Sequence, residues 1–198
     1  MKIKNLTFSY NSFTVFENFN FESASPIIVL KGPSGCGKTT LLKIISQNLV
    51  PTKSSFVEYS GNCYFVIQED SLLPWLTGEE NISKFLGTDV KTIQNLKLFP
   101  LVESFILKKA YEMSYGQRRM IELLRAIISK PDLLLLDEPF NFLDNKKRKD
   151  FALELLALSA SGTKLILTSH YNEDTSQLNS EVFYFDNKFP IKALSREE

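Results

Sequence analysis

The chain has 198 residues, enough to bury a core as one domain, and 43% of them are apolar and 23% charged, as in ordinary globular proteins. Lys plus Arg and Asp plus Glu are equal at 23 each, which excludes a strong net attraction to nucleic acid or anionic lipid. No apolar run approaches the roughly 20 residues of a membrane-spanning helix, and we expect no signal peptide and a reducing, cytoplasmic location.

The first third of the chain is predicted to be rich in strands. Apolar residues alternate with polar ones around residues 3–10 and 15–21, and residues 26–30 form a short apolar run. Two further segments, 56–59 and 63–67, flank a Ser-Gly-Asn turn and predict a β-hairpin. We therefore expect an antiparallel β portion at the N-terminus.

A phosphate-binding loop follows the third of these strands. Residues 32–40 read GPSGCGKTT, the spacing of a P-loop that ends in Lys38 and Thr39, and a helix-like segment comes next. Glycines let successive backbone N–H groups point at one anion, and the helix N-terminus adds its positive end. Lys38 is expected to reach the β- and γ-phosphates, and the Thr39 hydroxyl to bind Mg²⁺. The predicted nucleotide ligands in this loop are Gly32, Pro33, Ser34, Gly35, Cys36, Gly37, Lys38, Thr39 and Thr40.

Residues from about 75 to 130 are predicted to form an inserted helical lobe. Thr77 and Glu80 have the spacing of a capping box, with which a helix begins. The last helix of the lobe is marked by apolar residues at i, i+3, i+4, i+7 and i+8, counted from Met120.

Strands alternate with helices in the last third, which predicts a parallel sheet. Residues 133–136 read as a buried strand, 146–158 as a helix, 164–167 as a strand and 182–185 as one more. The predicted fold class is α/β: a P-loop NTPase core with a mostly parallel sheet, an N-terminal antiparallel β portion and an inserted helical lobe. All of it is expected to form a single domain over residues 1–198.

Polar residues follow three of the predicted strands, at the edge where α/β sheets bind ligands. Asp137 and Glu138 come directly after the leucine strand; we expect Asp137 to hold Mg²⁺ and Glu138 to act on an attacking water as general base. Gln68 follows a second strand, and His170, the only histidine of the chain, follows a third. This position predicts a contact between His170 and a γ-phosphate.

Ser114 and Gln117 have the spacing of a second capping box, at the start of the helix that contains Met120. A purely structural cap explains these residues. The free N–H groups of a helix N-terminus also make an anion site, which the lobe is expected to hold away from the chain's own P-loop. A second subunit would then have to supply the phosphate.

In their order along the chain, these motifs resemble the ATP-binding subunit of an ABC transporter over residues 1 to about 185. The matched features are the P-loop, Gln68, the Ser-Tyr-Gly-Gln signature, the Asp-Glu pair, Asp144 and His170. In this family two cassettes meet head to tail around two ATP molecules, each held by the P-loop of one subunit and the signature of the other. The resemblance therefore implies an ATPase that uses ATP and Mg²⁺.

The resemblance also implies a role for each matched residue. It assigns catalysis to Glu138, His170, Gln68 and Lys38. It assigns Mg²⁺ binding to Thr39, Gln68 and Asp137. It places Ser114 and Gly116 at the nucleotide of the opposite subunit, and it assigns nucleotide binding also to Gln117 and to Asp144, which lies in the loop through which the paired sites communicate.

Two aromatic residues complete the comparison with the family. Tyr10 is positioned like the adenine-stacking aromatic residue, with Phe8, Phe13 and Phe16 as alternatives and a half-buried strand aromatic as the plain structural explanation. Tyr115 departs from the family, whose signature usually has Gly there. The ring beside the phosphate is expected to alter ATP affinity or closure of the dimer.

The stretches 68–77 and 136–140 are similar to those of bacterial importer subunits for nitrate, sulfonates and taurine. The implied partners are a second, identical cassette, a separate transmembrane permease at the inner face of the cell membrane, and a substrate-binding protein. Trp75 is expected either to contact the permease or to be buried in the lobe.

Four other classes of protein compete with the importer subunit. An exporter subunit and a soluble assembly factor stay open. A P-loop kinase would have no use for the signature helix. A DNA-acting ABC ATPase would need a longer insertion between Gln68 and Ser114, so we expect no nucleic-acid partner.

Overall fold

The computed structural model describes residues 1–53, 56–59, 61–87, 93–94, 98–170 and 175–196. The elements of the first part are β1 (Lys2–Tyr10), β2 (Phe13–Glu22), β3 (Ile27–Lys31), α1 (Lys38–Ile45), β4 (Phe56–Glu58), β5 (Cys63–Val66) and α2 (Gly78–Leu86). Those of the second part are the 3₁₀ helices η1 (Phe99–Leu101) and η2 (Ala110–Glu112), then α4 (Tyr115–Ile128), β6 (Leu133–Leu136), α5 (Asn145–Ala160), β7 (Lys164–Ser169), β8 (Glu181–Tyr184) and β9 (Ser195–Arg196).

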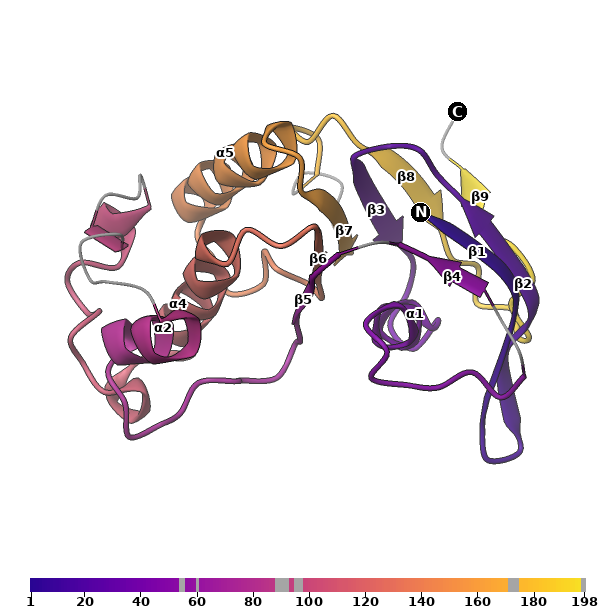
Figure 1. Cartoon of the computed structure of the whole chain (residues 1–198), viewed down its shortest axis with the longest axis horizontal. Coiled ribbons are helices and arrows are strands. Elements are labelled where there is room, and N and C mark those ends of the chain that lie inside the picture. Colours follow the sequence, from indigo (N-terminus) through magenta and orange to yellow (C-terminus); the bar gives the residue numbers. More distant parts are fainter. Residues whose placement is uncertain (54–55, 60, 88–92, 95–97, 171–174, 197–198) are drawn as a thin grey trace.

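A six-stranded sheet in the order β5-β6-β7-β3-β8-β9 forms the centre of the molecule (Figure 1). All neighbours in it run parallel except β9. Val66 pairs with Leu136, and Leu136 in turn pairs with Leu167. Because the strands are in register, the residues that follow β5, β6 and β7 reach the same edge of the sheet.

The predicted β-hairpin around residue 61 is wrong. β4 joins the antiparallel sheet β2-β1-β4, where Val57 pairs with Ile3, whereas β5 pairs with β6 in the parallel sheet. The start of β6 explains the difference: the Asp132 carboxylate accepts the N–H of Asn62 at 2.7 Å. Gly61 lies so close that a Cβ there would be 2.1 Å from Asp132 Oδ2. A contact between residues that are far apart in sequence therefore favours the pairing of β5 with the parallel sheet. Ser60, in the expected turn, lies outside the described residues.

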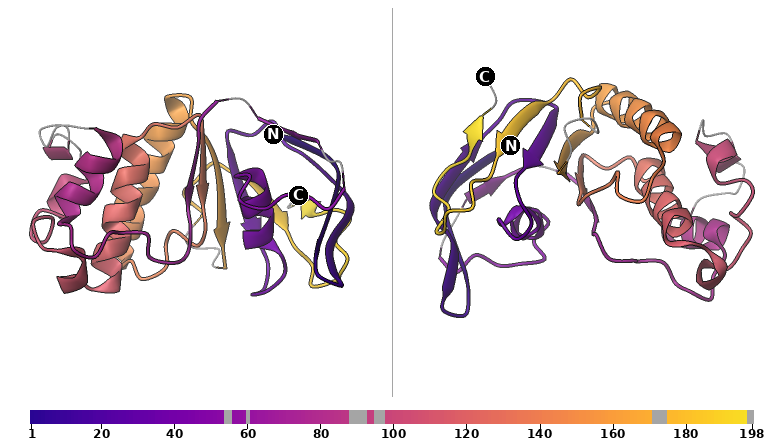
Figure 2. Two further views of the ribbon diagram at one scale, coloured as in Figure 1. Left: turned by 60° about the horizontal axis from the view of Figure 1, so that its bottom comes forward. Right: turned by 180° about the vertical axis from the view of Figure 1, so that it is seen from behind.

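Each face of the parallel sheet packs into its own hydrophobic cluster. Ile27 and Val29 of β3 pack with residues of α4, α5 and the helices near them. Ile28 and Leu30 pack on the other face with α1 and the antiparallel sheet. The alternation follows from the two-residue period of a strand. Figures 1 and 2 show α1 on one side of the sheet and α4 and α5 on the other.

The helices between β5 and β6 begin where capping boxes predict. Thr77 and Glu80 cap α2, and Ser114 and Gln117 cap α4, each pair with both reciprocal hydrogen bonds. The predicted fold class is confirmed: a mostly parallel α/β core, an N-terminal antiparallel sheet and inserted helices. Among the described residues, no helix combines the length and the apolar character that crossing a membrane requires.

Candidate functional site

The loop between β3 and α1 has the backbone geometry of a phosphate cradle. Gly32, Gly35 and Gly37 adopt φ values of 148°, 79° and 102°. A Cβ at Gly32 would lie 2.9 Å from the carbonyl oxygen of Phe185, so no larger residue fits there. Helix α1 begins without a side-chain cap and without an acidic residue in its first turn. Its first N–H groups and its positive end therefore suit an anion.

Lys38 folds over this loop instead of extending into solvent. Its ammonium group donates to the carbonyl oxygens of Gly32 at 2.7 Å and Pro33 at 3.0 Å. Next to it, Cys36 is fully buried, and burial raises the pKa of its thiol. The positive charge of the loop therefore lies on Lys38, over a cysteine that stays protonated at neutral pH.

Two acidic residues follow β6, and the carboxylate of the first reaches the cradle. Thr39 Oγ1 donates to Asp137 Oδ2 at 2.7 Å, and Asp137 is only 1% exposed. Thr168, at the end of β7, donates to Asp137 Oδ1 at 2.7 Å and accepts the backbone N–H of Glu138 at 2.8 Å. One buried hydroxyl thus sets the positions of both acidic residues.

Glu138 and His170 meet at the same edge. His170 Nε2 lies 2.9 Å from Glu138 Oε1. Burial, and then the charge of Lys38, lower the pKa of His170 below its ordinary value of 6.5, so the ring is neutral at pH 7. Glu138 has a positive φ of 49°, which is strained for a residue with a side chain and occurs preferentially at functional sites.

Two other predicted ligands, Gln68 and Tyr10, lie in different surroundings. Gln68 is exposed two residues beyond β5, and its carbonyl oxygen accepts the Tyr115 hydroxyl at 2.6 Å. Tyr10 is 44% exposed, and its hydroxyl lies 3.5 Å from Thr40 Oγ1, beside the P-loop. Phe8, one of the alternatives to Tyr10, is buried at 6% exposure in the core.

The signature residues are brought together with each other and with Gln68, not with the P-loop of the same chain. Ser114 and Gln117 use their side chains to cap α4. A Cβ on Gly116 would lie 2.9 Å from the carbonyl oxygen of Phe142, so this approach requires glycine. Asp144 caps α5, and a hydrogen bond from Lys147 lowers its pKa. Because α1 and α4 cover opposite faces of the sheet, the P-loop and the signature are separate within one protomer.

Comparison with known proteins assigns these features to a family. The family model described as "ABC transporter" matches residues 17–141. The aliphatic sulfonates import ATP-binding protein SsuB of Bacillus subtilis is 37% identical, over 85% of this chain and 71% of that protein. The chain belongs to the ABC transporter family. It is an ATP-binding cassette, and the cassettes of this family are ATPases.

Other comparisons agree with this assignment. The taurine import ATP-binding protein TauB of Escherichia coli O157:H7 is 31% identical, over 92% of the cassette and 78% of that protein. The spermidine/putrescine import ATP-binding protein PotA of Spiroplasma citri is 34% identical, but the cassette spans only 57% of its length. A solved structure of the cassette MJ0796, a dimer in a post-hydrolysis state bound to ADP and Pi, superposes with a TM-score of 0.85. It covers 100% of this cassette and 97% of that chain at 24% identity, which shows the shared fold.

The donor atoms of the cassette fit a magnesium ion that is bound together with phosphates. Mg²⁺ prefers oxygen ligands and usually binds one or two carboxylates, waters and phosphate oxygens. Thr39 and Asp137 offer a hydroxyl and a carboxylate oxygen 2.7 Å apart. Across the described part of the chain, no three His, Cys, Asp or Glu side chains cluster to hold a metal without other ligands.

Two buried residues of the cassette were missed by the sequence analysis. Thr168 positions Asp137 and Glu138, as described above. Arg119 is 3% exposed and donates to the carbonyl oxygens of Ile67 and Asp137, both at 2.6 Å. A hydroxyl two residues before a strand-end histidine was a usable signal for Thr168. No local signal identifies Arg119, because it lies beside the apolar face of a helix whose sequence pattern is fully explained by the packing of that face.

Proposed function

We propose that two copies of this cassette enclose two ATP molecules and that hydrolysis drives a separate membrane permease. The observation that carries the proposal is the separation of the two anion sites. The P-loop shares one edge of the sheet with Asp137, Glu138 and His170, whereas Ser114 begins a helix on the opposite face. A second copy in head-to-tail orientation supplies the missing signature to each P-loop, which makes both sites complete.

The residues at the P-loop divide the chemistry among them. Lys38 and the N–H groups of the loop neutralise the β- and γ-phosphates. Thr39 and Asp137 would hold Mg²⁺, which would supply positive charge against the charge that develops on the phosphates. Glu138 accepts a proton from the attacking water, and Gln68 orients that water. His170, neutral at pH 7, donates a hydrogen bond toward the γ-phosphate.

A glutamine in place of Glu138 tests the hydrolysis step. Glu138→Gln preserves the shape of the side chain and removes the proton acceptor, so we expect ATP turnover to be abolished while an ATP-dependent dimer accumulates. Steady-state ATPase assays and size-exclusion chromatography with and without Mg-ATP measure both effects. Unchanged turnover would refute the assignment of Glu138 as the base. A protein that stays monomeric in every nucleotide state would refute the dimeric site.

The surface next to Gln68 supports contact with a permease. Trp75 is 62% exposed, so the alternative that it is buried in the helical lobe is wrong. Leu72, at 8% exposure, anchors the same segment in the core. The segment therefore displays an apolar ring in water, and tryptophan is enriched among the residues that carry most of the binding energy at protein interfaces. We place the cassette at the inner face of the membrane, bound to a permease that a substrate-binding protein serves.

The relatives named above are import ATP-binding proteins for aliphatic sulfonates, taurine and spermidine/putrescine, so we propose that the complex is an importer. The transported solute follows from the permease, which purification can identify. We expect the tagged cassette to copurify with an integral membrane protein from detergent extracts, and Trp75→Ser to lose that protein while ATP turnover in isolation is retained. Copurification with soluble proteins alone would favour an assembly factor.

A further inference from the structure

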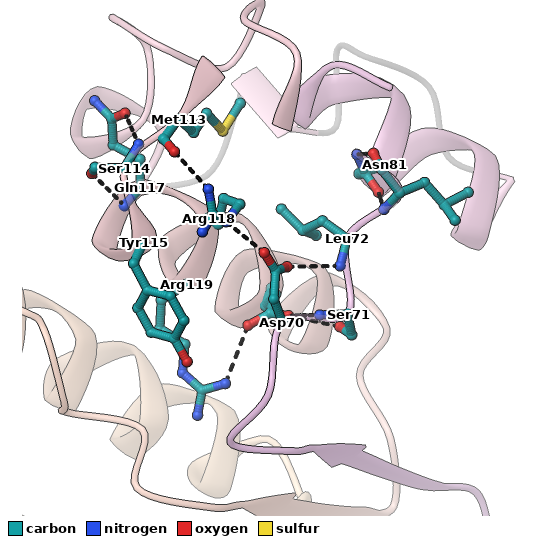
Figure 3. A network of polar contacts seen from close by, with 12 residues as sticks. Asp70, Ser71, Leu72, Asn81, Met113, Ser114, Tyr115, Gln117, Arg118 and Arg119 are labelled. Carbon is teal, nitrogen blue, oxygen red and sulfur yellow. Dashed lines mark hydrogen bonds and ion pairs between the residues drawn. The ribbon is translucent and has the colours of Figure 1, made fainter. Parts of the chain in front are cut away.

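Three side chains from the first turns of α4 bind the segment that carries Gln68. Figure 3 shows these three, Tyr115, Arg118 and Arg119, with the ion pair between Arg118 and Asp70. The Tyr115 hydroxyl donates to the Gln68 carbonyl oxygen at 2.6 Å. Arg118 Nε lies 2.5 Å from a carboxylate oxygen of Asp70. Arg119 Nη1 donates to the carbonyl oxygen of Ile67 at 2.6 Å. The backbone on both sides of the Gln68 side chain is therefore attached to the signature helix.

The same helix is also attached to the segment that carries Glu138. Arg119 Nη2 donates to the carbonyl oxygen of Asp137 at 2.6 Å, so one planar guanidinium binds the residues just before Gln68 and Glu138. The Tyr115 ring meets the Phe142 ring edge to face, with centroids 4.5 Å apart. Because the planar guanidinium of Arg119 binds carbonyl oxygens, it fixes the backbone of both segments, whatever the conformation of the catalytic side chains.

Buried charges keep this arrangement in place. Glu122, 3% exposed, lies 3.2 Å from Arg119 Nη1. Its other oxygen accepts both the N–H of Ser71 at 2.5 Å and the hydroxyl of Ser71 at 2.8 Å. If α4 moved away from the segment after β5, the buried Arg119 and Glu122 would lose their bonds to Ile67 and Ser71, so the two are expected to move together.

We propose that Tyr115 is a positioning residue for hydrolysis. When the nucleotide of a partner subunit binds to the signature, the hydroxyl and the ring of Tyr115 set the position of Gln68 in the same protomer. The inference rests on the dimeric ATPase proposed above. A glycine, which the family usually has at this place, carries neither the hydroxyl nor the ring. The link is therefore built by a residue in which this cassette departs from the common signature.

A double-mutant cycle tests whether Tyr115 acts through Gln68. Tyr115→Phe keeps the ring against Phe142 and removes only the hydroxyl, so we expect kcat for ATP to fall about fivefold, the effect of one hydrogen bond, with KM unchanged. In a Gln68→Ala background, where the Gln68 side chain is gone, the same change is expected to cost less than about twofold. Radiolabelled ATP gives the sensitivity that the slower background requires.

Controls separate positioning from folding. Tyr111→Phe removes the hydroxyl of a tyrosine that is 61% exposed on the same lobe, and it is expected to leave turnover unchanged. Tyr115→Phe is expected to match the wild type in urea unfolding and in nucleotide binding by the monomer. A purely structural role would instead lower stability and would affect both backgrounds equally.

The outcomes distinguish this inference from the function on which it rests. Wild-type turnover that Glu138→Gln abolishes, together with an ATP-dependent dimer, supports the function. With those present, an equal loss in both backgrounds or no loss in the wild-type background overturns the role of Tyr115 alone. Absence of turnover and dimer in the wild type overturns the proposed function, and this inference with it.

Discussion

Thr39 Oγ1 lies 2.7 Å from Asp137 Oδ2, although the two residues are 98 positions apart in the chain. The contact joins the first turn of α1 to the end of β6 and brings the P-loop and the acidic pair into one site. A hydroxyl and a carboxylate oxygen this close together are suited to share one Mg²⁺ ion, the role proposed for them above.

Removing the hydroxyl of Thr39 is expected to lower Mg²⁺-dependent hydrolysis. Thr39→Val keeps the branched shape but offers no oxygen, and we expect a loss of about 100-fold, since even outer partners of metal ligands contribute about 10- to 100-fold. The measurement is the ATPase rate as a function of Mg²⁺ concentration. Thr39→Ser retains the oxygen and is the matched control. Equal rates for the valine and serine variants would contradict the predicted ligand.

Thr168 is expected to contribute to stability as well as to activity. In Thr168→Val, the N–H of Glu138 and the carboxylate of Asp137 each lose a partner inside the core. Unsatisfied buried groups of this kind cost about 1–3 kcal/mol each in the free energy of unfolding. Urea denaturation measures this cost, and Thr168→Ser is expected to recover most of it. If the valine variant unfolds at the wild-type urea concentration, the hydroxyl does not position the acidic pair.

The difference between Thr39 and Thr168 illustrates what the sequence allows one to predict. Thr39 belongs to a contiguous motif, and local spacing suffices to identify it. The capping boxes at Thr77 and Ser114 and the leucine strand before Asp137 were predicted for the same reason. Each depends on residues within a few positions of one another.

Features that depend on distant pairings were not predictable in this way. β5 pairs with β6 because Asp132 contacts Asn62, 70 positions away. Arg119 binds carbonyl groups on two different strand ends, and backbone groups carry no sequence signal. The fold class and the residues of the P-loop could be predicted from local patterns. The contacts that join the separate parts of the site could be identified only from the structure.

His170 is expected to make the free energy of unfolding depend on pH. Its pKa is lowered in the folded state, so the unfolded chain binds a proton at a higher pH than the folded chain does. Stability therefore falls as the pH drops below 6.5 and levels off once the folded-state pKa is passed.

The comparison of wild type with His170→Gln isolates this effect. The α-amino group of Met1, whose pKa burial lowers to about 6, titrates in the same range but is common to both proteins. Urea unfolding at a series of pH values from about 7.5 to 5 is expected to show a steeper acid loss for the wild type than for the variant. Parallel curves would mean that the folded protein does not disfavour the charged ring.

Asn81 in α2 is expected to tolerate an isosteric change poorly. Its side chain is fully buried; Oδ1 accepts the N–H of Leu73 at 2.8 Å, and Nδ2 donates to carbonyl oxygens including those of Leu73 at 3.1 Å and Thr77 at 3.0 Å. In Asn81→Asp a carboxylate faces those carbonyls without a proton to donate. We expect the free energy of unfolding to fall by about 3 kcal/mol or more at pH 7, with partial recovery on acidification as the carboxyl group regains a proton.

Asn187→Asp makes the same change at an exposed position and is expected to have little effect in the same urea titration. Equal unfolding midpoints for the two variants would show that the Asn81 amide does not hold the segment that displays Trp75.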